Sequence, residues 1–106
     1  MQFEERYGWT AILGSAPLRA EESDRHPVLR LEKGDLWAET HGEPGIDPVI
    51  MYERCLIEAL SLEESQAEDE AERATIGDAL RRAQMEERVS QQMRREAAEV
   101  AAVEVN

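Results

Sequence analysis

The chain has 106 residues, with 24 acidic and 12 basic side chains, and its formal net charge is −12 at pH 7. This length allows one domain. The negative charge excludes direct binding to nucleic-acid phosphate or an anionic membrane surface, because both would repel the chain. One cysteine, Cys55, excludes an intrachain disulfide and a cysteine-built metal centre. No apolar run is long enough to cross a membrane.

The first third of the chain predicts β structure. Residues 9–13, Trp-Thr-Ala-Ile-Leu, form a short apolar run of strand-forming residues, and Gly14 is expected to close it. The polar segment from Leu18 to His26 predicts a loop or one helical turn, with solvated charges. Residues 28–40 then carry the clearest strand pattern in the chain.

A hairpin turn is expected inside that pattern. If Lys33 and Gly34 form a two-residue turn, Leu31 faces Leu36 across the hairpin. Lysine tolerates a positive φ angle poorly, so a longer loop with a bulge at Gly34 is the alternative. An isolated hairpin is marginal in water, and this one must therefore pack on the helices or on another chain.

Arg30 and Trp37 are predicted to share the outer face of the hairpin. Both residue types are enriched at the centres of protein interfaces, which makes this pair a candidate interface. A cation–π pair that covers the face of an ordinary sheet is the alternative interpretation.

The two histidines, His26 and His41, have no companions at the spacing of metal ligands or of an acid–base pair. We expect turn histidines that face water, and we expect no metal site. Gly42, Pro44 and Gly45 then mark a linker. A single domain over 1–106 would therefore have a β-rich subregion, 1–45, and a helical subregion, 46–106.

Asp47 and Pro48 predict a helix start, because aspartate caps free N–H groups and proline fits the first helical position. The next residues are apolar around more than half of the helix, from Val49 to Leu60, which predicts the centre of the core. Cys55 falls within this sector and is expected to be a small core residue.

Acidic residues dominate the next stretch, where six of the ten residues from 63 to 72 are acidic. The acidic block consists of Glu63, Glu64, Glu68, Asp69, Glu70 and Glu72. It is expected to face water, cations or a basic partner. One interpretation is a solvated helix face. The other is a row of carboxylates along a rigid rod that imitates a phosphate backbone.

A break is expected in the helical region, because one helix over all of it would be too long for this chain to cover. Gly77 weakens helix, and residues 61–64 and 75–78 both resemble capping boxes. We place the break near 74–78, giving an antiparallel helical pair. One continuous long helix is the alternative.

The last helix carries two apolar stretches on different faces. Ile76, Leu80 and Ala83 are expected to pack on the chain's own core. The second stretch is expected to bind another molecule and consists of Val89, Met93, Ala97, Val100 and Val103.

The fold class predicted is therefore α+β, with strands at about 9–13, 28–32 and 35–40 and a helical region over 47–104. No glycine-rich phosphate loop, serine-centred or metal-binding signature occurs, so we expect no enzyme, no cofactor and no small-molecule substrate.

Two functions fit this sequence. The first is an acidic adaptor or structural subunit of a larger complex, viral or cellular, that binds a protein partner or associates with itself. The second is an acidic mimic of nucleic acid, for example a phage anti-defence inhibitor. In either case the expected location is the cytoplasm, or a virus particle assembled there.

Overall fold

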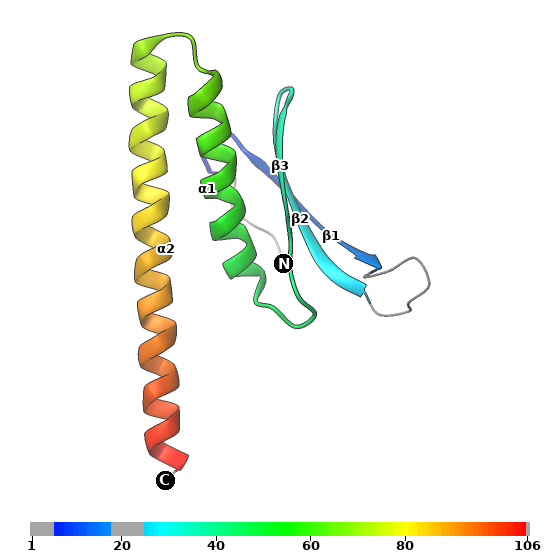
Figure 1. Ribbon diagram of the computed structural model, residues 1–106, viewed down its shortest axis with the longest axis vertical. Helices are drawn as coiled ribbons and strands as arrows, with labels where there is room; N and C mark the ends of the chain where they lie inside the picture. Colours follow the sequence, from blue (N-terminus) through cyan, green and yellow to red (C-terminus); the bar gives the residue numbers. More distant parts are fainter. Residues whose placement is uncertain (1–5, 18–24, 106) are drawn as a thin grey trace.

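The computed structural model describes residues 6–17 and 25–105. Its elements, in chain order, are β1 (Thr10–Pro17), β2 (Arg25–Lys33), β3 (Leu36–His41), α1 (Pro48–Gln66) and α2 (Glu70–Val105). The strands form one antiparallel sheet in the order β1-β2-β3. Figure 1 shows α1 lying between this sheet and α2. The predicted α+β class, an N-terminal sheet followed by a helical region, is confirmed.

The β2–β3 turn lies one position later than predicted. Gly34 and Asp35 form it, and Lys33 pairs with Leu36. Gly34 has a φ of 59°, as the first central position of a type II′ turn requires. Each cross-strand pair therefore moves by two positions. Because side chains alternate with a period of two, every residue keeps its predicted face.

The first two strands are longer than predicted. β1 continues through Gly14 to Pro17, and β2 begins at Arg25. The partner strand supplies the hydrogen bonds that allow β1 to continue, and the Arg25 guanidinium also donates to the Ser15 carbonyl at 2.8 Å. The rest of the loop predicted before β2, residues 18–24, lies outside the described residues.

The core forms between α1 and the sheet. As predicted, Asp47 caps α1, with its carboxylate accepting from the Val49 N–H at 3.0 Å, and Pro48 opens the helix. Successive turns of α1 bury Met51, Tyr52, Cys55, Leu56, Ala59 and Leu60. These side chains pack with Leu29, Leu31 and Ala38 of the sheet and with Trp9, which precedes β1. Helical spacing therefore predicted the central core element.

The helical region breaks at residues 67–69, and the predicted break near 74–78 is wrong, as is the single continuous helix. Asp69 caps α2, because its carboxylate accepts from the Ala71 N–H at 3.2 Å. The Arg73 guanidinium donates to the Ala67 carbonyl at 2.6 Å and holds the turn closed. An aspartate followed three positions later by Glu72 was the sequence signal for this start.

Gly77 lies inside α2 and is buried against α1. A Cβ atom built there would lie 2.8 Å from the Glu64 carboxylate oxygen. Gly77 therefore does not end the helix, and the nearest group of α1 is the end of the Glu64 side chain.

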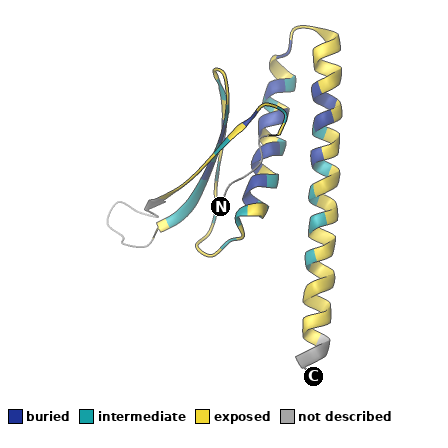
Figure 2. Cartoon of the chain, turned by 180° about the vertical axis from the view of Figure 1, so that it is seen from behind, coloured by how far each residue is buried: buried dark blue, intermediate teal, exposed yellow. Residues whose placement is uncertain are grey.

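The two helices differ greatly in length, with 19 residues in α1 and 36 in α2. Figure 2 shows buried residues on α2 only where it lies beside α1, and exposed residues beyond. Within the described ranges, no helix is both long and apolar enough to span a membrane.

Candidate functional site

Among the described residues, half of the exposed large hydrophobic side chains lie in a row along α2. Its large members, Met85, Val89, Met93 and Val100, are each 53–65% exposed. With the exposed Ala97 between the last two, we call these five residues the α2 apolar row. Residues spaced by three or four share one face of a helix. The row is therefore a continuous ridge. The side chain of Val103, which was predicted to extend it, lies outside the described residues.

A different face of α2 holds the helix against α1. Ile76, Ala79 and Ala83 are buried in the core, and the partly buried Leu80 packs beside them. The helical period places this face about a third of a turn from the α2 apolar row. The prediction that the first apolar stretch packs on the chain's own core is confirmed.

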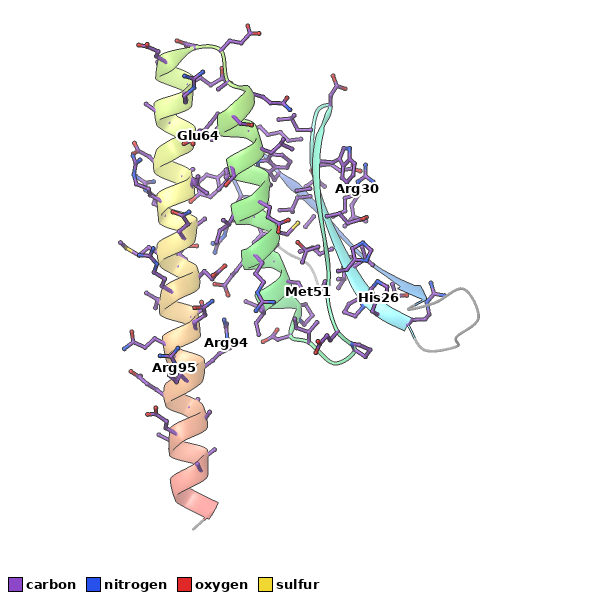
Figure 3. The ribbon with its side chains drawn as sticks, viewed as in Figure 1. His26, Arg30, Met51, Glu64, Arg94 and Arg95 are labelled. Carbon is purple, nitrogen blue, oxygen red and sulfur yellow. The ribbon has the colours of Figure 1, made fainter. Side chains whose placement is uncertain are left out.

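The contact between the two helices ends near Arg94, whose guanidinium lies 3.5 Å from the Glu53 carboxylate on α1. In Figure 3, Arg94 reaches from α2 toward the first turn of α1. Every residue from 95 to 102 is exposed. The last turns of α2 therefore extend past the rest of the chain without a covering layer among the described residues.

A second exposed surface is the sheet face that points away from α1. The Arg30 guanidinium lies 4.5 Å from the centre of the Trp37 ring and 2.9 Å from the Glu32 carboxylate. Figure 3 shows Arg30 on this outer side. Trp37 remains half exposed. The structure thus brings the predicted pair together as a cation–π contact on a face that no other described element covers.

Glu63 does not face a partner, contrary to the prediction for the acidic block. The residue is only 7% exposed, and its carboxylate accepts hydrogen bonds from the Lys33 ammonium at 2.7 and 3.0 Å. Lys33 stands at the end of β2, above the last turns of α1. Tertiary pairing of residues thirty positions apart along the sequence therefore neutralises this acid.

The rest of the acidic block gathers around the α1–α2 turn instead of running along a rod. Glu68, Glu70 and Glu72 are exposed there, and Asp69 caps α2. Glu64 is half-buried, and Figure 3 shows it at the same end of the helical pair. The exposed acids of this block are therefore gathered at one end of the helical pair.

The structure also joins the two histidines, which the sequence did not predict. His26 Nε2 lies 2.8 Å from His41 Nδ1, and His41 Nε2 lies 3.0 Å from the Glu39 carboxylate. Strand alternation places residues 39 and 41 on one face, and the sheet register brings His26 beside them. The contact is a hydrogen-bonded chain of side chains. Nowhere in residues 6–17 and 25–105 do three or more metal-ligating side chains gather as a metal site.

Cys55 is fully buried, as expected of a core residue. Its thiol lies 3.5 Å from the Ala38 carbonyl and 3.7 Å from the Leu29 carbonyl. Burial raises the pKa of the Cys55 thiol above its usual value. A protonated, enclosed thiol is a poor nucleophile.

No protein-family model matches the chain, and comparisons with the curated proteins and with the solved structures find no match either. A functional proposal for this chain therefore depends on its exposed surfaces, above all the α2 apolar row.

Proposed function

We propose that this chain is a non-enzymatic protein–protein interaction protein, an adaptor or structural subunit of a larger complex. The observation that carries the proposal is the α2 apolar row, whose four large side chains are each more than half exposed. Burying apolar surface against a partner contributes about 25 cal/mol of binding free energy per Å² removed from water. Contiguous exposed apolar surface of this kind marks interaction sites in soluble proteins.

The form of the row indicates what it binds. Residues four positions apart form ridges that fit the grooves between side chains of a second helix. Met85 and Met93 have flexible, polarisable side chains that adapt to an irregular surface. The proposed partner surface is therefore an apolar helix or helical groove of a protein.

Charged side chains beside the row are of both signs. Arg88 and Arg95 lie on α2 near Glu96 and Glu99, whereas the exposed charges of residues 68–72 at the α1–α2 turn are all negative. Exposed ion pairs contribute little free energy each, on the order of 0–1 kcal/mol. In this proposal the charges determine how the partner is oriented, and the α2 apolar row provides most of the binding free energy.

The proposed setting is the cytoplasm or a virus particle assembled there, and the proposal includes neither a cofactor nor a small-molecule substrate.

The alternative is a mimic of nucleic acid. Its support is the group of exposed carboxylates at the α1–α2 turn, Glu68, Glu70 and Glu72 among them. That support is weaker, because Lys33 neutralises Glu63 and the remaining acids occupy one end of the helical pair.

The two functions differ in how the complex responds to salt. A tagged chain would be used to capture its partner from the native source, and the mass of the intact complex would give the stoichiometry. Apolar contacts should survive about 1 M salt and added DNA, whereas electrostatic contacts are screened at that ionic strength. Release by salt or by competing DNA would overturn the adaptor and favour the mimic.

A further inference from the structure

The free edge of β1 has an unusual composition for this chain. Charged residues make up 34% of the sequence, yet none occurs in β1, Thr10–Pro17. The opposite edge strand, β3, carries Glu39 and His41. Edge strands normally carry charges or bulges that prevent pairing with another chain. In a protein of net charge −12, two copies can approach along β1 without opposing like charges on the paired strands.

The register of the sheet determines which backbone groups this edge presents. The Gly42 N–H donates to the Pro27 carbonyl at 2.9 Å, so odd-numbered residues of β2 bond toward β3. Bonding directions alternate along an antiparallel strand, and the even-numbered residues of β2 therefore bond to β1. In the observed register, Ala11, Leu13 and Ser15 then direct their N–H and C=O groups away from the sheet.

Both ends of this edge are already occupied. The Trp9 N–H donates to the Arg6 carbonyl at 3.0 Å. At the other end, the Arg25 guanidinium donates to the Ser15 carbonyl at 2.8 Å and to its hydroxyl at 3.0 Å. The stretch left open among the described residues is therefore short, and it centres on the N–H and C=O groups of Ala11 and Leu13.

We propose that this edge pairs with β1 of a second copy, antiparallel across a two-fold axis at Ile12. Ala11 then exchanges two hydrogen bonds with the partner's Leu13, and by symmetry Leu13 exchanges two with the partner's Ala11. The open N–H and C=O groups of Ala11 and Leu13 are thus satisfied in both copies. The sheets of two chains become one sheet. This inference rests on the proposed function, a chain that acts by binding proteins, and names a second copy as one partner.

The side chains agree with this register. Ile12 is 48% exposed on the outer face and meets the partner's Ile12, while Leu13, 40% exposed on the other face, covers the partner's Ala11. Arg30, which lies opposite Ile12 in the sheet, is ion-paired with Glu32 at 2.9 Å. The two-fold axis therefore brings apolar side chains together on both faces without opposing unpaired charges.

Disulfide trapping tests the register. Directly opposed residues of a non-hydrogen-bonded pair have Cα atoms about 4.5 Å apart, within the range of roughly 4.4–6.8 Å that a disulfide spans. Ile12→Cys should therefore form a covalent dimer on mild oxidation, detected on a non-reducing gel. Trp37→Cys, exposed on the same face two strands away, is the matched control and should stay monomeric. Cys55 stays in place in both variants because it is buried.

Sedimentation equilibrium supplies the second readout. Ile12→Lys places like charges directly opposite each other across the axis, which destabilises a strand pair. Its dimer dissociation constant should rise at least about tenfold above that of Ile12→Gln, which removes the same apolar side chain without adding charge. Far-UV circular dichroism would show that both variants fold.

An Ile12→Cys variant that stays monomeric like its control overturns the proposal, as does a wild-type chain that is monomeric at about 1 mM. Failure here is distinguishable from failure of the proposed function, because the α2 apolar row lies on another element. A Val89→Glu substitution should leave the disulfide yield of Ile12→Cys unchanged, whereas it should weaken partner capture by α2.

Discussion

The Lys33 ammonium and the Glu63 carboxylate form an ion pair that joins the end of β2 to α1. Lys33 Nζ lies 2.7 and 3.0 Å from the two Glu63 oxygens and 2.9 Å from the Tyr7 carbonyl. The Glu63 side chain is 9% exposed and that of Lys33 is 41% exposed. The Lys33 ammonium therefore links β2 to α1 and to the segment at Tyr7, and it pairs with an acid that would otherwise be buried without a partner.

Glu63→Gln should destabilise the fold. The neutral amide can still accept a hydrogen bond from the ammonium, but Lys33 loses the negative charge that pairs with it. A hydrogen bond to a charged group contributes about 1.5–3 kcal/mol, and the exposure of Lys33 reduces this, so we expect a loss of about 1–2 kcal/mol. The check is the midpoint of urea denaturation, followed by circular dichroism.

Glu68→Gln is the matched control, because Glu68 belongs to the same acidic block and is exposed. Surface substitutions of this kind change stability by less than about 0.5 kcal/mol. Equal denaturation midpoints for the two variants would contradict a structural role for Glu63.

Gly77→Ala should stabilise the chain, although Gly77 is buried between the helices. The added Cβ meets the end of the flexible Glu64 side chain, which can move aside. Alanine gains about 1 kcal/mol of helix propensity over glycine. We expect a higher thermal midpoint for Gly77→Ala and a lower one for Gly77→Leu, whose larger side chain would push α2 away from α1. A lower midpoint for both would show that the packing tolerates no side chain at all.

Asp69→Ala tests where the second helix begins. Loss of a capping side chain costs about 0.5–2 kcal/mol. Thr75→Ala is the comparison, since Thr75 lies inside α2 with its hydroxyl bonded to the Ala71 carbonyl at 3.1 Å, and alanine suits a helix interior better. Urea denaturation should show destabilisation for Asp69→Ala alone. Destabilisation by Thr75→Ala alone would indicate that the second helix begins at residue 75.

The elements that depend on local signals were predictable from sequence. Asp47 and Pro48 determine the start of α1 by direct capping, and helical spacing identified its buried face. The hairpin followed from strand propensity and Gly34, with an error in the turn that shifted the pairing by two positions. That error left each residue on its predicted face, because the faces of a strand alternate with a period of two.

The features that depend on contacts between distant residues were not predictable. Glu63 resembles its acidic neighbours in sequence, and only the position of Lys33 over α1 makes it a buried partner. Gly77 looked like a break because helix propensity ignores the neighbouring helix. His26 and His41 are joined by the alignment of β2 with β3, which no spacing along the chain reveals.

Cys55 should make stability depend on pH. Because burial raises the pKa of the thiol above its ordinary value of 9.0, the folded chain keeps a proton that the unfolded chain loses. This contribution is complete below about pH 9 and is lost as the pH rises further. The free energy of unfolding of the wild type, relative to Cys55→Ala, should therefore be lower at pH 10 than at pH 7, and the fall should begin near pH 9. A difference that stays constant would contradict a raised pKa.

The most direct test of the proposed function replaces the centre of the α2 apolar row. The double variant Val89→Glu, Met93→Glu keeps good helix formers in place but removes the apolar ridge, whereas Gln91→Glu adds an acid on another face of the same helix. The measurement is the amount of intact complex captured from the native source at matched protein concentration. We predict that the double variant loses the complex and that Gln91→Glu keeps it. Equal capture by both variants would show that the α2 apolar row does not bind the partner.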